Sequence, residues 1–109
     1  MPTTDEPGKP TGRAEIASDE AGVPVIKLVG EIDLSNVDSV RATIEPTVSS
    51  APDRIIFDLS SLDFLDSSGI ALLLFAAAKS GSVQLRNASE IVRRIIEVTG
   101  LAAVLPMDP

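Results

Sequence analysis

Apolar and polar positions alternate in a short run near the N-terminus, and a run rich in β-branched residues follows it, which together predict a pair of β-strands. These strands lie at residues 14–18 and 23–30, and the Asp-Glu-Ala-Gly sequence between them predicts a tight turn, so the two form a hairpin. Pro24 has no amide hydrogen to donate, which favours a place at the start of a strand or on a sheet edge. Residues 1–13 contain three prolines and two glycines and predict a flexible tail ahead of one domain at residues 14–109.

After the hairpin, apolar residues recur three or four positions apart, which predicts a helix. Ser35 and Asp38 resemble a capping box at the start of this helix, and Pro46 is expected to kink or shorten its last turn. A nearly continuous apolar run at residues 54–59 then predicts a strand that is buried on both faces. The apolar face of the helix consists of Val37, Val40, Ile44 and Val48.

The remaining chain repeats this alternation of strand and helix. The predicted segments are a loop at 60–66, a nearly all-apolar helix at 67–79 that ends before Gly81, a strand at 82–86, a helix capped by Asn87 and Glu90 that ends at Gly100, and a last strand at 103–105. Strands that alternate with crossover helices predict an α/β fold with a mostly parallel sheet.

Composition and charge exclude several classes of function. The chain has no His and no Cys, which excludes His-dependent catalytic triads, His-ligated metals, thiol nucleophiles and disulfides. The formal net charge of −7 lies entirely outside the neutral tail, and it disfavours nucleic acid and anionic membranes as partners. The longest apolar run, residues 70–78, is too short to span a bilayer, and no secretion signal is predicted, so we expect a cytoplasmic protein.

The segment with most chemical potential is Asp66-Ser67-Ser68-Gly69, at the predicted start of the all-apolar helix. Asp66 is the expected N-cap, and both serines fall in the first turn. A phosphate attached there would meet free amide groups and the positive end of the helix dipole, and Gly69 would let another protein approach the backbone. Residues of these types at a helix start are most often simple caps, so the chemistry alone leaves a cap and a phosphoacceptor both open.

The run from Leu62 to Ile70, Leu-Asp-Phe-Leu-Asp-Ser-Ser-Gly-Ile, resembles the signature of STAS domains, in particular bacterial anti-sigma factor antagonists. Gly-Glu-Ile-Asp at residues 30–33 and Val-Thr-Gly-Leu at residues 98–101 resemble two further runs of that family, so the resemblance covers about residues 14–107. It implies a mixed, mostly parallel sheet with the hairpin at one edge. Family members commonly continue into a fourth helix, which we expect to be absent from this chain.

The resemblance also implies a function in transcription regulation rather than catalysis. The unphosphorylated antagonist binds an anti-sigma factor, itself an ATP-dependent serine kinase, and thereby frees a sigma factor; phosphorylation releases the partner, and a serine phosphatase restores the antagonist. No cofactor or metal is implied. The implied phosphorylation site is Ser67, with Ser68 as second candidate, although helical periodicity by itself favours Ser68 as the exposed hydroxyl. The resemblance further implies that Asp66 and Gly69 orient the site and that the partner interface includes Asp33, Asp63 and Ser68.

Four alternatives compete with this interpretation. A hydrolase with a serine nucleophile would lack its base, because the chain has no His. A receiver-like domain phosphorylated on Asp58 would lack the expected acidic pair and late Lys. A metal site formed by Asp58, Asp63 and Asp66 has suitable oxygen ligands, but such residues are more often solvated or capping. A STAS module that acts as a scaffold or ligand sensor without switching is the main alternative.

Overall fold

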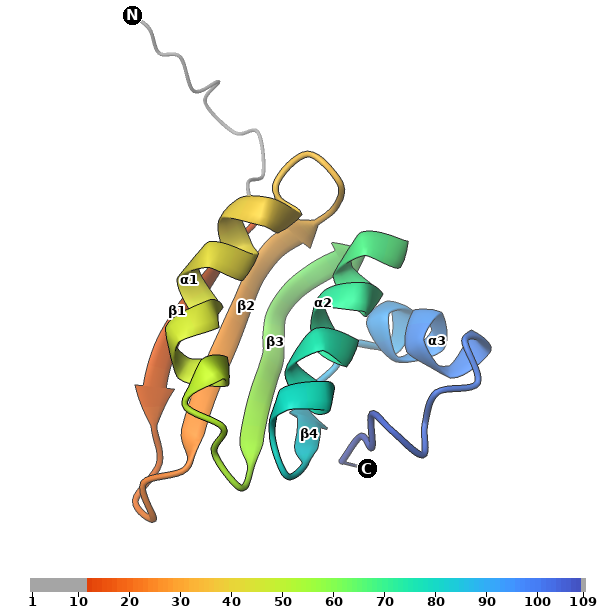
Figure 1. Ribbon diagram of the computed structural model, residues 1–109. Coiled ribbons are helices and arrows are strands. Elements are labelled where there is room, and N and C mark those ends of the chain that lie inside the picture. Colours follow the sequence, from red (N-terminus) through yellow and green to blue (C-terminus); the bar gives the residue numbers. More distant parts are fainter. Residues whose placement is uncertain (1–11, 109) are drawn as a thin grey trace, which may run out of the picture.

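The computed structural model describes residues 12–108, and residues 1–11 and 109 lie outside the described part. The predicted tail therefore falls almost entirely outside it, although Arg13 is already the first residue of a strand. Figure 1 shows the elements in chain order: β1 (Arg13–Ser18), β2 (Pro24–Ile32), α1 (Val37–Ser49), β3 (Ile55–Leu65), α2 (Ser67–Lys79), β4 (Val83–Arg86) and α3 (Glu90–Val98).

The four strands form one mixed sheet in the order β1-β2-β3-β4. β1 and β2 pair as an antiparallel hairpin, whereas β2 with β3 and β3 with β4 pair in parallel, so the predicted α/β class and edge hairpin are confirmed. The carboxyl ends of β2 and β3 lie at the same end of the sheet, where Ile32 pairs with Leu65. This parallel pairing brings the loop after β2 next to the start of α2.

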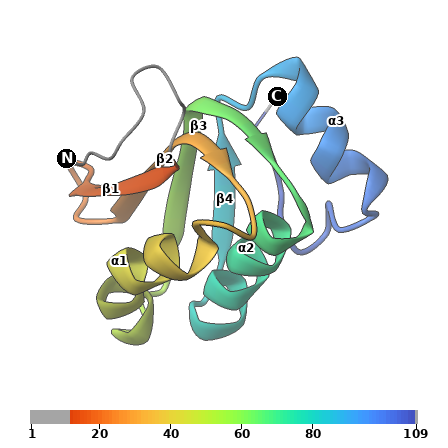
Figure 2. The same ribbon diagram turned by 90° about the horizontal axis from the view of Figure 1, so that it is seen from above.

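The helices are distributed unequally around the sheet. α1 and α2 lie side by side on one face, whereas α3 lies beside β3, away from α1 (Figure 2). Aliphatic side chains and one aromatic ring, Phe57, fill the core, and no polar or charged side chain of residues 12–108 is buried. The largest fully buried side chains are Phe57, Ile26, Leu28, Ile32, Ile44, Ile55, Ile56, Leu59, Leu65, Leu73, Leu85 and Ile96.

The predicted loop at residues 60–66 is wrong, because β3 continues through these positions to Leu65. The pairing of β2 with β3 shifts between Lys27 and Val29 and again between Gly30 and Glu31, and β3 contributes one extra residue at each shift. Each such bulge reverses the alternation of inward and outward side chains. The strand therefore lacks the regular alternation by which a half-buried strand is recognised in a sequence.

Of the three predicted helix caps, Asp66 at the start of α2 is confirmed and the other two are wrong by one or two residues. α1 begins after Asn36, whose side chain makes no capping hydrogen bond, instead of after Ser35. α3 begins after Ser89, whose Oγ accepts a hydrogen bond from the Val92 amide, while Asn87 adopts a left-handed conformation in the preceding turn. In each region several residues of the capping type are adjacent, so composition alone does not identify which one caps.

Pro46 does not shorten α1, which continues past it to Ser49, and the alternative that this proline kinks the helix stays a prediction. The strand predicted at residues 103–105 is wrong. Residues 102–104 form a turn and not a strand; pairing with β4 occurs later, as a single parallel bridge between Leu85 and Met107. Among residues 12–108, no helix has both the length and the apolar character needed to cross a membrane.

Candidate phosphorylation and partner-binding site

Asp66 is the N-cap of α2, and its carboxylate joins two segments of the chain. Oδ1 accepts hydrogen bonds from the Ser68 amide at 2.8 Å, the Ser68 hydroxyl at 2.8 Å and the Gly69 amide at 3.2 Å. Oδ2 accepts a fourth hydrogen bond from the amide of Leu34, at 3.2 Å, in the loop between β2 and α1. The same side chain therefore caps α2 and holds that loop against it.

The hydrogen bonds of Asp66 also determine its ionisation. Partial burial by itself would raise the pKa, but the hydrogen bonds from Ser68, Gly69 and Leu34 outweigh it and hold the pKa of Asp66 below its ordinary value of 3.8. The carboxylate is therefore ionised at neutral pH, when it best accepts these four hydrogen bonds.

Ser67 and Ser68 are the first two residues of α2, but they present their hydroxyls differently. Ser68 is half-buried, and its hydroxyl donates to Asp66 Oδ1. Ser67 is exposed, and its hydroxyl makes no hydrogen bond with any other residue of the described range 12–108. The exposure inferred from helical periodicity is therefore wrong: Ser67 and not Ser68 is the accessible hydroxyl, because the apolar residues of α2 extend around most of the helix and leave its inner face poorly defined by sequence.

The loop between β2 and α1 is held by its own polar side chains. The Asp33 carboxylate accepts hydrogen bonds from the amide and hydroxyl of Ser35. Asn36 Oδ1 accepts from the Asp33 amide at 3.1 Å, and Asn36 Nδ2 donates to the Glu31 carbonyl at 2.8 Å. Between these fixed residues, the side chain of Leu34 is 78% exposed. Asp33 is expected near this site from the sequence, whereas Leu34 is not. Leu34 belongs neither to the apolar pattern of the strand before it nor to that of the helix after it, so its type alone does not indicate a role.

Gly69 and Asp63 occupy positions that differ from expectation. Gly69 is buried: a Cβ atom there would lie 2.7 Å from the Leu65 Cβ and 3.3 Å from the Ile32 carbonyl oxygen. Its missing side chain lets α2 pack closely on the sheet, and it does not open the backbone to a partner. Asp63 is exposed on β3 and not in a loop. No three acidic side chains within residues 12–108 come close enough together to hold a metal ion.

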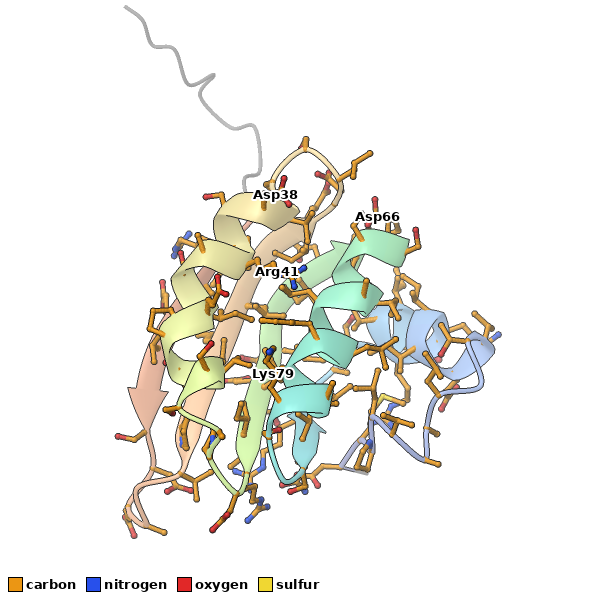
Figure 3. The ribbon with its side chains drawn as sticks, viewed as in Figure 1. Asp38, Arg41, Asp66 and Lys79 are labelled. Atoms are coloured by element: carbon orange, nitrogen blue, oxygen red, sulfur yellow. The ribbon has the colours of Figure 1, made fainter. Side chains whose placement is uncertain are left out.

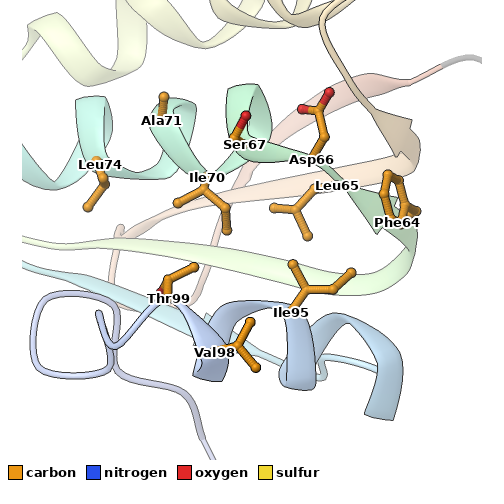
Figure 4. A pocket seen from close by; sticks show the side chains of 10 residues that line it. All are labelled: Phe64, Leu65, Asp66, Ser67, Ile70, Ala71, Leu74, Ile95, Val98 and Thr99. Atoms are coloured by element: carbon orange, nitrogen blue, oxygen red, sulfur yellow. The ribbon is translucent and has the colours of Figure 1, made fainter.

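An apolar groove of about 470 Å³ lies beside Ser67, between α2 and α3 (Figure 4). The end of β3 contributes Phe64 to it, and Phe64 is 41% exposed. The residues that line the groove are Phe64, Leu65, Asp66, Ser67, Ile70, Ala71, Leu74, Ile95, Val98 and Thr99.

Figure 3 shows four charged residues of the paired helices α1 and α2. Asp38 and Asp66 lie at the N-terminal ends of the two helices. Arg41 and Lys79 lie farther along, where the Arg41 guanidinium is 4.0 Å and the Lys79 ammonium 5.8 Å from the centre of the Phe75 ring. The cation–π contact of Arg41 links α1 to α2, whereas that of Lys79 lies within α2. The end of the molecule that carries Ser67 is acidic.

Proteins of known kind are similar to this chain in sequence and in fold. The family model described as "Mlab, STAS domain" matches residues 16–106. An anti-sigma F factor antagonist of Lysinibacillus sphaericus is 35% identical over 82 residues, which cover 71% of this chain and 70% of that protein. The chain belongs to the STAS domain family, among its anti-sigma factor antagonists.

Solved structures agree with this assignment. The crystal structure of an anti-sigma factor antagonist from Mycobacterium paratuberculosis is 30% identical and gives a TM-score of 0.77, covering 95% of this chain and 89% of that one. The Bacillus cell fate determinant SpoIIAA in its phosphorylated form is 28% identical and gives a TM-score of 0.65, covering 88% of this chain and 91% of that one. Both similarities extend over nearly the whole described chain.

Proposed function

We propose that this chain is an anti-sigma factor antagonist that is controlled by phosphorylation of Ser67. In its unphosphorylated form it binds an anti-sigma factor that is also a serine kinase, and a sigma factor is thereby freed. The kinase transfers the γ-phosphoryl group of ATP to Ser67 Oγ and releases ADP, after which the complex dissociates. A serine phosphatase hydrolyses the phosphoserine and restores the binding form. The chain is thus the substrate of these enzymes and has no catalytic role itself.

The observation that carries this proposal is the exposed, uncommitted hydroxyl of Ser67 at the start of α2. A kinase must reach the hydroxyl oxygen directly, and the neighbouring Ser68 hydroxyl is already held by Asp66. The helix N-terminus also accepts a phosphate favourably, because its amide groups and its dipole stabilise negative charge. A relative of known structure, SpoIIAA, exists in a phosphorylated form, which supports modification of this family's members.

Local charge explains how the phosphate would release the partner. A phosphoserine adds about −1.5 to −2 charges at pH 7, here directly beside Asp66 on a chain whose formal net charge is already −7. A partner surface that fits a neutral hydroxyl would then meet both bulk and unpaired negative charge, and such mismatches cost several kcal/mol. A loss of about 3 kcal/mol corresponds to roughly 100-fold weaker binding.

The modification itself is tested by intact-mass measurement of the protein after incubation with the anti-sigma kinase of the same organism and ATP. The wild type should gain the mass of one phosphate, Ser67→Ala none, and the matched control Ser68→Ala the same as wild type. Phosphate on Ser67→Ala but not on Ser68→Ala would move the site to the neighbouring serine.

The switch is tested by calorimetric titration of the same kinase with two variants. Ser67→Ala should bind with the affinity of the wild type and stay bound when ATP is added. Ser67→Asp should bind about 100-fold more weakly. Equal affinities for the two variants would contradict the switch.

The apolar groove beside Ser67 favours one second candidate, a STAS module that senses a small apolar ligand without switching. The volume of the groove, about 470 Å³, lies within the range of small-molecule sites. This candidate predicts that Ser67→Asp leaves partner binding intact, whereas a bulky substitution at Ala71 in the groove removes ligand binding. The two candidates are therefore separated by the same titration.

A further inference from the structure

We infer that Leu34 is an apolar anchor of the partner interface and that Asp66 is the residue that positions it. This inference rests on the proposed function, because the partner is the anti-sigma factor. Leu34 is 78% exposed, more than any other large hydrophobic side chain of residues 12–108, and it stands at the tip of the loop between β2 and α1. An apolar side chain held in water without intramolecular cover is stabilised when a partner covers it.

The backbone of this loop is fixed before any partner binds. The Leu34 amide donates to Asp66 Oδ2, the Asp33 carboxylate holds Ser35, and Asn36 bonds to the backbone on both sides of the turn. A side chain on an ordered backbone loses little conformational entropy on binding, so most of the free energy of burying it contributes to affinity. Exposed leucines on mobile loops lack this advantage.

The charges around Leu34 define the chemistry of the partner surface. The two segments that meet at Leu34 and Ser67, residues 30–40 and 60–72, contain carboxylates and no Lys or Arg; Arg41, which follows the first segment, lies over the Phe75 ring. None of these carboxylates forms an ion pair with a residue of the described part of the chain, where the ion pairs are Arg13–Glu15 and Arg86–Asp108. The carboxylates are Glu31, Asp33, Asp38, Asp63 and Asp66.

A surface of this kind fits one type of partner site: an apolar pocket for Leu34 bordered by Lys and Arg side chains. A few side chains that fill central, desolvated pockets carry most of the binding energy of a protein interface, and the surrounding charges determine orientation and rate of association. The acidic border also places Leu34 and Ser67 on one continuous surface, because Asp66 contacts the Leu34 amide and directly precedes Ser67.

Substitution of Asp66 by Asn separates its two roles. Asn Oδ1 can still accept the hydrogen bonds of the Ser68 and Gly69 amides, because Asn is as good an N-cap as Asp. The Nδ2 group would then face the Leu34 amide, so two donors would oppose each other and the loop would lose its tie to α2. Asp63→Asn is the matched control, because it removes one exposed carboxylate of the same site without breaking a hydrogen bond within residues 12–108.

The experiment measures the dissociation constant of the full chain with the anti-sigma factor by calorimetry. Leu34→Ala should weaken binding about 10-fold or more, whereas Ile91→Ala, another exposed apolar residue, should leave it within about twofold. Asp66→Asn should weaken binding more than Asp63→Asn does. In the Leu34→Ala background, however, Asp66→Asn should have no greater effect than Asp63→Asn, because the side chain that it positions is already gone.

Three outcomes would overturn all or part of this inference. Leu34→Ala that binds like wild type, while Ser67→Asp does not bind, would refute the anchor and leave the proposed function intact. If Asp66→Asn raised the dissociation constant by the same factor in the Leu34→Ala background as in the wild type, the positioning role of Asp66 would be refuted. Absence of any binding by the wild type would instead refute the proposed function, and the anchor with it.

Discussion

Removal of the Asp66 side chain is the most direct test of how the site is built. Asp66→Ala deletes four hydrogen bonds at once: three at the start of α2 and one to the Leu34 amide. The cost of losing a hydrogen bond depends on whether its amide donor can reach water. The Leu34 amide is in an exposed loop and can bond to water instead, whereas Gly69 is buried against the sheet and its amide loses its partner.

The size of the effect follows from these two environments. Loss of an N-cap costs about 1 kcal/mol, and an unpaired buried amide adds up to roughly another 1 kcal/mol. We therefore expect Asp66→Ala to reduce the free energy of unfolding by about 1–2 kcal/mol. For a domain of this length, each kcal/mol lowers the melting temperature by about 4–8 °C.

Thermal unfolding followed by circular dichroism measures this loss, with Asp63→Ala as the matched control. Asp63 is exposed and its side chain makes no hydrogen bond with residues 12–108, so its removal should change stability by less than about 0.5 kcal/mol. If Asp66→Ala melted together with Asp63→Ala, the carboxylate would not stabilise α2, and the reasoning from the cap would fail.

Three other predictions concern stability. Hydrogen bonds hold the pKa of Asp66 below 3.8 in the folded chain. The stability that the Asp66 carboxylate contributes is therefore present above pH 3.8 and is lost as the pH falls through the folded pKa. In denaturant titrations between about pH 6 and about pH 3, Asp66→Asn should lose less stability than the wild type does. Gly69→Ala places a Cβ 2.7 Å from the Leu65 Cβ and should destabilise the fold by about 1–3 kcal/mol in the same titrations. Ser67→Asp should melt within a few degrees of wild type, since the helix N-terminus favours the added charge; a large loss would show that phosphorylation acts by unfolding.

Much of the fold could be predicted from sequence where one periodicity persisted through an element. α2 was predicted with its observed bounds, because Asp66 caps it and its apolar residues run without interruption to Lys79. The hairpin followed from alternation and a turn-forming sequence. The second half of β3 could not be predicted, because its two bulges depend on pairing with β2, and a partner strand is not visible in a local pattern.

The site was predictable only in part for a related reason. The residues at the start of α2 are consecutive in sequence, so their types and spacing indicate a cap and two hydroxyls. Which hydroxyl is free depends on the bond between Ser68 Oγ and Asp66, which is a matter of side-chain geometry. The role of Leu34 depends on a contact across 32 positions of sequence, between its amide and Asp66.

That long-range contact is a consequence of the sheet. Parallel pairing aligns Ile32 with Leu65, and the Asp66 amide continues the pairing by donating to the Ile32 carbonyl at 3.1 Å. One residue beyond each strand end, the β2–α1 loop and the start of α2 are therefore forced into contact. An aspartate at this position can cap the helix and fix the loop at the same time. The geometry around Ser67 thus derives from strand register, and under the proposed function we expect a phosphate there to alter binding by charge while the fold stays the same.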